Sequence, residues 1–300
     1  MVKKRGISRA AVFTLAVVSV LFAFPLLVTF TNSFMTESEI ALNYTGSLSV
    51  FDLSDGQTEK FLSVTLIPNR VTLGQYKTAL INQPAFLILL FNSLKLVLPV
   101  CVFNLLVSLL AAYGFTVWRF KFKEAVFFVY IVVMLLPLQA VLVPNYIVAD
   151  FFGLTHRGAV LGLPASYFAI ILPGVFAPFG TFLLRQTMKA IPLEMFEAAR
   201  IDGAGDFQIF ARIAAPQLKS GVSALVMLVF IEYWNTVEQS VVFIKDYYNE
   251  PLSVFLSRLS SSRMGLIFAV SCVYMLPPFL LLLFGQQDLE TGIELSGIKG

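Results

Sequence analysis

The chain has 300 residues, of which 58% are apolar and 13% are charged, and its mean hydropathy is +0.82. These values exclude an ordinary soluble domain, in which about a quarter of the residues carry charge. The formal net charge is only +3, which does not indicate a nucleic-acid partner. Most of the chain is therefore expected to lie in lipid.

Six stretches of the chain are apolar over about 20 residues, which is enough to cross a hydrocarbon core roughly 30 Å thick. Their bounds are Ala10–Thr31, Phe86–Val107, Ala125–Ile147, Ala159–Leu184, Val222–Ile244 and Gly265–Gly285. Continuous Leu, Val and Phe runs of this length argue against a barrel of short alternating strands. We expect an all-α membrane protein with six transmembrane helices.

The basic residues indicate the orientation of these helices. With the N-terminus in the cytoplasm, thirteen Lys and Arg fall in inside segments and seven in the longer outside segments. The positive-inside rule therefore places both termini in the cytoplasm. A cleaved signal peptide is the competing interpretation of the first thirty residues, but their apolar run is too long for one. The expected organisation is a tail and first span at 1–31, an external segment at 32–85, a five-helix core at 86–285 and a cytoplasmic tail at 286–300.

Residues that commonly carry chemistry are sparse. Cys101 and Cys272 fall within predicted spans, where they indicate packing, and His156 stands alone in a short outside loop. The chain has no phosphate-binding loop of the Gly-x-x-x-x-Gly-Lys-Ser/Thr type, no HExxH motif and no nucleophile elbow. We predict a non-catalytic subunit without a catalytic residue, metal or cofactor of its own.

A polar loop at 185–221 separates the fourth and fifth spans. Pro192 suits the start of a short helix, because its missing N–H would be unsatisfied there anyway. Glu194 and Glu197 then lie near the positive end of the helix dipole, and Gly203 stands where a left-handed residue ends a helix. The sequence predicts that this helix begins near Pro192 and ends before Gly203.

A second short helix is expected to follow in the same loop. Asp206 can cap it, and it would run from Phe207 to about Ile213 and end before Pro216. Two interpretations of the first helix remain open. Its apolar stripe either packs against the protein's own helices, with Glu197 paired to Arg200, or it faces a partner protein.

The spacing within the loop favours a partner. Glu197-Ala198-Ala199 is followed after three residues by Gly203, and after nine more by Ile213, with Pro216 three positions on. This pattern resembles the coupling loop of permease subunits in ABC importers, E-A-A, three residues, G, nine residues, I-x-L-P, with Ala215 in place of the Leu. The resemblance implies a type I importer permease fold, in which a cytoplasmic helix-turn-helix sits in a cleft of the ATPase subunit. The coupling residues it implies are Glu197, Ala198, Ala199, Asp202, Gly203, Ile213 and Pro216.

Other segments resemble the carbohydrate-uptake branch of that family, typified by the smaller permease subunit of maltose importers. They are Asn92-Ser93-Leu94-Lys95, Ala112-Tyr113-Gly114-Phe115 before Arg119-Phe120-Lys121, and Pro68, Thr72, Leu73 and Tyr76 of a short surface helix. The ending Ser296-Gly297-Ile298-Lys299-Gly300 is similar to tails that enter the interface between the two ATPases. The resemblance implies contact with the ATPases by Gly297, Lys299 and Gly300.

The fifth predicted span carries polar groups that are costly in a membrane. Glu232 and Glu238 would point about 120° apart on a continuous helix, with Asn235 between them. We hypothesise a translocation path formed by Asn92, Lys95, Glu232, Tyr233, Trp234, Asn235 and Glu238. Lys95 is the candidate partner of one glutamate. In the alternative, Glu238 lies near the outer headgroups and Lys95 snorkels there too.

The resemblance implies a permease subunit of an ATP-driven importer for a sugar or oligosaccharide in the bacterial inner membrane. Its implied partners are a second permease, two ATPase subunits that bind ATP and Mg, and an extracytoplasmic binding protein. One alternative is the same machine carrying a polyol or a glycerol phosphate ester. Another is an ion-coupled secondary transporter, which would have no use for the loop.

Overall fold

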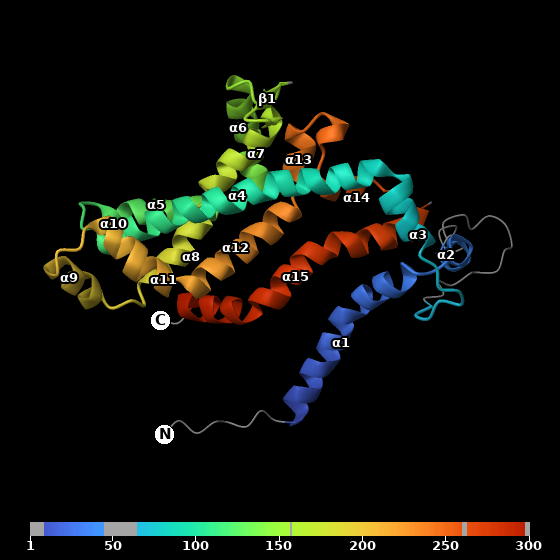
Figure 1. The fold of residues 1–300 in the computed structure, drawn as a ribbon, viewed down its shortest axis with the longest axis horizontal. Coiled ribbons are helices and arrows are strands. Elements are labelled where there is room, and N and C mark those ends of the chain that lie inside the picture. Colours follow the sequence, from blue (N-terminus) through green and yellow to red (C-terminus); the bar gives the residue numbers. More distant parts are fainter. Residues whose placement is uncertain (1–8, 45–64, 157, 260–262, 298–300) are drawn as a thin grey trace. The chain divides into compact units, whose positions relative to one another are not determined.

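A computed structural model describes residues 9–44, 65–156, 158–259 and 263–297, and they are almost wholly helical (Figure 1). The chain divides into two compact units, Met1–Leu87 with Arg258–Leu276, and Ile88–Ser257 with Pro277–Gly300. Four described helical stretches are long and apolar enough to cross a membrane, or six if each of two bent pairs counts as one crossing. The predicted helical membrane fold is confirmed, whereas the count of six and the orientation stay predictions.

The first unit contains the whole of the predicted external segment, 32–85. Its described elements are α1 (Arg9–Asn32), α2 (Glu37–Tyr44), α3 (Gly74–Lys77), the π-helical η2 (Thr78–Asn82) and the beginning of α15 (Met264–Gly297). Most described side chains of α1 are exposed, as expected for an apolar helix whose solvent is lipid. The small core consists of Met35, Ile40 and Tyr44, with Met264 and Phe268 packed against it.

Hydrogen bonds hold the chain between α1 and α3 in place. The Glu39 carboxylate accepts a bond of 2.8 Å from the backbone N–H of Asn69, and the Ser33 and Tyr76 hydroxyls are 2.7 Å apart. The surface helix predicted around Tyr76 is α3, which leads through η2 toward α4 (Pro84–Val117). Residues 45–64 of the predicted external segment lie outside the described residues.

The second unit is a helical assembly around α8 (Pro178–Met188). Both α5 (Lys123–Met134) and α12 (Lys219–Trp234) pack against α8, and α13 (Glu238–Phe243) packs against α6 (Leu138–Phe151) and α7 (Ala165–Val175). The remaining elements are the β1 (Ala159–Val160) and β2 (Leu163–Pro164) hairpin, the 3-10 helix η4 (Tyr247–Asn249), α14 (Leu252–Arg258), the loop helices described below and the end of α15. Within this unit, α9 (Leu193–Ile201) and the group of α6, β1 and α13 lie at opposite ends (Figure 1).

The third predicted span, Ala125–Ile147, is not one helix. It consists of α5 and α6, which are bent by 101° at the break between Met134 and Leu138. Pro137 lies in this break with an extended backbone, φ −66° and ψ 141°. A proline in a helix interior removes a backbone hydrogen bond and clashes with the preceding turn, so the break follows from the sequence at that position.

The fourth and fifth predicted spans are also interrupted. Residues 159–164 form the hairpin, so helix begins only at Ala165, and Ala177 is extended between α7 and α8 because Pro178 follows it. The fifth span ends as a helix at Trp234 and resumes at Glu238. The prediction of a continuous helix over Val222–Ile244 is therefore wrong, and the angle of about 120° between the two glutamates does not apply.

Two glycines allow α8 and its neighbours to approach closely. A Cβ at Gly180 would collide with the Ser108 hydroxyl of α4, and a Cβ at Gly221 would lie 2.8 Å from Oγ1 of Thr187. Small residues at such crossings let helix backbones pack where lipid offers no hydrophobic driving force. The packing of α4, α8 and α12 depends on the absence of side chains at these two positions.

A buried arginine fixes the loop-proximal end of α8. Arg185 is 2% exposed, lies 2.5 Å from the Glu124 carboxylate, donates from Nε to the Phe115 carbonyl at 3.3 Å and covers the Phe127 ring at 3.7 Å. Burial, together with the Arg185 charge, lowers the pKa of Lys189, which caps α8. The contacts of Arg185 join the ends of α4, α5 and α8 just before the polar loop.

Candidate functional site

The first helix of the polar loop is α9, with Pro192 at its N-cap. Phe196 is 1% exposed and anchors the helix to the rest of the unit. Gly203 has φ +82°, and the N–H of Ala204 donates to the Ala199 carbonyl at 2.9 Å, which closes the helix end. The predicted start near Pro192 and the left-handed conformation of Gly203 are confirmed.

The second helix differs from the prediction. Its N-cap is Gly205, not Asp206, and the helical path runs through α10 (Asp206–Ile209), the π-helical η3 (Phe210–Ala214) and α11 (Ala215–Gln217), past Pro216. Ala215 is helical, with φ −59° and ψ −42°. A π-turn is wider than an α-turn, and Pro216 stands in the first turn of α11, where a missing N–H is tolerated. The prediction that the helix ends before Pro216 was therefore wrong.

This second segment is anchored to the end of α4. The Tyr113 hydroxyl donates to the Asp206 carbonyl at 3.4 Å, and the Tyr113 and Phe210 rings meet edge to face at 5.4 Å. Fully buried apolar side chains along the segment are Ile209, Ala214 and Leu218. Ile213 and Ala215 are half-buried. The departure from the family pattern at Ala215 thus falls at the edge of the packed face.

The outward face of α9 carries charge and exposed apolar groups. Glu197 pairs with Arg119 at 3.4 Å, with 57% and 89% of the two side chains exposed, and not with Arg200. Arg200 instead lies 3.5 Å from Asp206. The large apolar side chains exposed on α9 and at the start of α10 are Leu193, Met195, Ile201 and Phe207. Exposed apolar groups gathered on one short loop are typical of a protein–protein contact.

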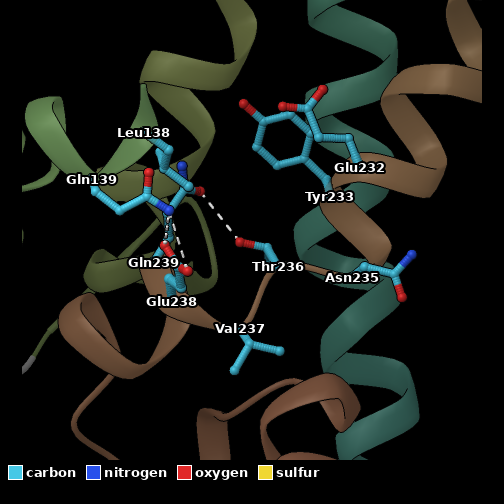
Figure 2. Close-up of a pocket in the computed structure, with 9 residues that line it drawn as sticks. All are labelled: Leu138, Gln139, Glu232, Tyr233, Asn235, Thr236, Val237, Glu238 and Gln239. Atoms are coloured by element: carbon cyan, nitrogen blue, oxygen red, sulfur yellow. Dashed lines mark hydrogen bonds between the residues drawn. The ribbon is translucent and has the colours of Figure 1, made fainter. Parts of the chain in front are cut away.

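A cavity of about 300 Å³ lies where the two helix breaks of the second unit meet (Figure 2). Its lining comes from the start of α6, the end of α12 and the start of α13, namely Leu138, Gln139, Glu232, Tyr233, Asn235, Thr236, Val237, Glu238 and Gln239. The Gln139 amide donates to both oxygens of the Glu238 carboxylate, at 3.4 and 3.2 Å. Irregular backbone at membrane depth is tolerated where it lines such a cavity.

The wall beside Glu232 contains a buried tyrosine. Tyr233 is 7% exposed. The ring packs against Gly174 of α7, where a Cβ would lie 2.7 Å from the hydroxyl oxygen. Figure 2 shows the Glu232 carboxylate and the Tyr233 ring extending together, while Asn235 points away from Gln139.

The structure separates the other residues predicted for the translocation path from this cavity. Trp234 is 1% exposed and stacks on Phe230 at 5.3 Å. Asn92 is buried, and its amide donates to the carbonyls of Tyr248 at 2.7 Å and Glu250 at 3.2 Å. Lys95 is exposed, and no ion pair joins it to either glutamate among the residues that the structure describes.

Sequence reasoning missed Gln139 and Asn104. Gln139 follows the break at Pro137, which was the available signal for a cavity-lining position. Asn104 is 1% exposed, and its amide donates to the carbonyls of Gly174 at 2.8 Å and Val175 at 3.3 Å. Gly174 lies four residues before Pro178, so the Asn104 amide replaces the N–H that Pro178 lacks.

The C-terminal tail is only partly described. Gly297 is the last residue of α15, and Lys299 and Gly300 lie outside the described residues. Near the start of the predicted tail, the Ser223 hydroxyl of α12 donates to the Asp288 carboxylate at 3.0 Å. Cys101 and Cys272 are free, and within the described ranges no group of three or more His, Cys, Asp or Glu side chains is placed to hold a metal ion.

Comparison with known proteins identifies the family. The model for the binding-protein-dependent transport system inner membrane component matches residues 104–288. The arabinooligosaccharides transport system permease protein AraQ of Bacillus subtilis is 30% identical over 213 residues, which are 70% of this chain and 73% of the relative. The sn-glycerol-3-phosphate transport system permease protein UgpE of Agrobacterium fabrum is 26% identical over 300 residues, 98% of each chain.

Two solved structures show the same fold. A chain of a bacterial ABC transporter involved in the import of the acidic polysaccharide alginate matches with a TM-score of 0.71 and 19% identity, over 94% of this chain and 98% of that one. A chain of the alginate ABC transporter in complex with alginate pentasaccharide-bound periplasmic protein matches with a TM-score of 0.58 and 14% identity, over 91% and 92%. This chain therefore belongs to the binding-protein-dependent transport system inner membrane components, the permease subunits of ABC importers.

Proposed function

We propose that this permease imports a sugar or oligosaccharide across the bacterial inner membrane. Support comes from relatives named for arabinooligosaccharide and lactose transport, and from the segments that resemble the carbohydrate-uptake branch. Its proposed partners are a second permease, two ATPase subunits and a periplasmic binding protein. The structural relative in complex with a substrate-bound periplasmic protein supports the last of these.

The observation that carries the mechanism is the geometry of α9. Phe196 fastens one side of the helix to the unit, while Glu197, Ala198 and the exposed apolar side chains face outward. We infer that the outward face docks in a cleft of the ATPase. Small residues permit close approach, and the left-handed Gly203 sets the angle at which the chain turns back. Asp202, Ile213 and Pro216 would shape that turn and the second helix.

Energy for transport then comes from the partners. The ATPases would bind ATP and Mg, and their closure would move α9 and, through Tyr113 and Arg185, the ends of α4, α5 and α8. The tail residues Gly297, Lys299 and Gly300 are proposed to contact the same partners. The permease itself carries no step of ATP hydrolysis in this mechanism.

We propose that the cavity forms part of the translocation path. Its lining includes two carboxylates, two glutamine amides and an asparagine amide, and no Lys or Arg. Hydroxyl-rich neutral molecules find hydrogen-bond partners there, whereas a phosphate ester would meet negative charge. This lining favours a neutral sugar over a glycerol phosphate ester, the substrate class for which several relatives are named.

Two experiments test these proposals. Glu197→Ala and Gly203→Ala should each reduce association of the ATPases or transport-coupled ATP hydrolysis. A secondary transporter would be largely insensitive to both substitutions. Unchanged ATPase association and unchanged coupled ATP hydrolysis would therefore contradict the coupling proposal. Replacing Glu232 and Asn235 with Ala should lower uptake while the complex still assembles. Unchanged uptake would remove the cavity from the path without affecting the coupling proposal.

A further inference from the structure

A short segment between α4 and α5 alternates aromatic and basic side chains. It reads Trp118-Arg119-Phe120-Lys121-Phe122-Lys123. The three aromatic side chains are 51%, 44% and 68% exposed in chain order, so they are not part of the protein core. Phe122 also has φ +65°, a conformation that is strained for a bulky side chain.

This segment surrounds an open hollow of about 620 Å³. The hollow is lined by the side chains of residues 119–125, which are Arg119, Phe120, Lys121, Phe122, Lys123, Glu124 and Ala125. The Lys123 ammonium donates to the carbonyls of Thr116 at 3.4 Å and Trp118 at 3.1 Å, which closes the segment into a ring. The lining is therefore preformed and not a chance gap between loose chains.

The charge in the hollow is positive. Arg119, Lys121 and Lys123 contribute three cations, and the Glu124 carboxylate is paired with the buried Arg185 at 2.5 Å. Lys121 lies over the Phe122 ring at 5.2 Å, and among the described residues the ion pair of Arg119 is the exposed one with Glu197 at 3.4 Å. An exposed pair of this kind contributes little to stability, so the guanidinium is available to another anion.

The position of the hollow suggests which anion. It follows directly on the apolar stretch Ala85–Val117, at the point where a membrane span ends. Aromatic side chains are enriched at the headgroup level of a bilayer, and basic residues beside a span attract anionic lipids. Both features occur together here, on a segment of the chain that already lies at a membrane boundary.

We propose that residues 118–123 bind the headgroup of an anionic phospholipid. The phosphodiester would accept hydrogen bonds from Arg119 and Lys121, while Trp118, Phe120 and Phe122 enter the region between headgroups and acyl chains. Because Arg119 also contacts Glu197, the bound phosphate competes with the coupling helix for one guanidinium. This inference does not depend on which substrate the permease carries.

Fluorescence quenching tests the proposal on the assembled transporter. The complex is placed in bilayers containing either brominated phosphatidylglycerol or brominated phosphatidylcholine at equal mole fraction, and Trp118→Phe supplies the background. Phosphatidylglycerol should quench Trp118 more strongly. Arg119→Gln with Lys121→Gln should lower the apparent phosphatidylglycerol affinity about twenty-fivefold, since each cation near the surface contributes about fivefold.

Arg212→Gln is the matched control, because Arg212 is an exposed cation in η3 of the same unit. It should leave the quenching unchanged, and Glu197→Gln should raise it by freeing Arg119. Equal quenching by the two lipids would overturn the proposal, as would an undiminished response in the double variant or an equal loss in the control. Loss of ATPase association without lipid dependence would assign the segment to the ATPase interface instead.

Discussion

Asn104→Ala tests how the fold tolerates the break between α7 and α8. In the native chain the Asn104 amide donates to the carbonyl of Gly174, which Pro178 cannot reach because it has no N–H. Asn104 is 1% exposed, so water does not readily replace the lost donor. The N–H of Ala177 still donates to the Gly174 carbonyl at 3.2 Å, so the substitution is expected to remove one of two bonds to that carbonyl together with the Asn104 bond to the Val175 carbonyl.

The magnitude follows from the two hydrogen bonds that are lost. Leaving a buried polar group unpaired costs about 1–3 kcal/mol, and hydrogen bonds between membrane helices average about 0.6 kcal/mol with a maximum near 1.7. Asn104 makes two such bonds, of which the one to Val175 is long at 3.3 Å. We expect a loss of about 1–2 kcal/mol in the free energy of unfolding.

The assay is the apparent melting temperature of the purified complex in detergent. Asn104→Ala should lower it by roughly 2–4 °C. Pro178→Ala restores a backbone N–H four residues after Gly174 and releases Ala177 from its extended conformation. In that background Asn104→Ala should cost much less, so the two substitutions form a double-mutant cycle with a measurable coupling energy.

Ser108→Ala is the control, because it removes only the 3.4 Å bond to Oδ1 of Asn104. Its effect should not exceed about 0.5 kcal/mol. An Asn104→Ala variant that melts at the native temperature would refute the reasoning. A loss that is undiminished in the Pro178→Ala background would refute it as well.

Three further substitutions probe the loop and the helix crossings. Arg185→Ala should lower the free energy of unfolding by about 2–4 kcal/mol. Glu124→Gln should lower it by less than about 1 kcal/mol, because the Glu124 side chain is 70% exposed. Equal losses in melting temperature would contradict this expectation. Gly203→Ala should cost about 1–2 kcal/mol of loop stability and reduce coupled ATP hydrolysis, because Gly203 has a left-handed backbone. Gly205→Ala is the control and should have neither effect, because Gly205 has equal free space but φ −72°. Equal effects of the two substitutions would exclude a backbone cause. Gly221→Ala should impair assembly of the complex on native gels, with partial rescue by Thr187→Ala.

Local backbone structure could be predicted from the sequence wherever a few neighbouring residues determine the backbone conformation. The Pro192 start, the left-handed Gly203 and the apolar runs of α1 and α4 follow from residue type and spacing alone. The prediction failed at Pro216 because the π-turn of η3 carries the helix past the proline. It failed across 222–244 because apolar composition does not show where a helix ends inside a span.

The candidate site was likewise predictable only in part from the sequence. The sequence predicted that Glu232, Tyr233, Asn235 and Glu238 lie together because they would share one continuous helix. They do line one cavity, but that helix ends at Trp234. Gln139 joins them from a helix almost a hundred residues earlier, and only packing of α13 against α6 brings it there. The alternating segment at 118–123 was not predicted from the sequence as a basic and aromatic patch, and its hollow depends on the Lys123 bonds that close it.

The sequence by itself determined that this is a helical membrane protein of the permease family, because hydropathy and motif spacing are properties of consecutive residues. Tertiary structure alone decided the pairing of Glu197 with Arg119, the burial of Arg185 and the replacement of the Pro178 N–H by the Asn104 amide. Each of these joins groups that are far apart in the chain. Such contacts depend on how the helices break and cross, which no local pattern specifies.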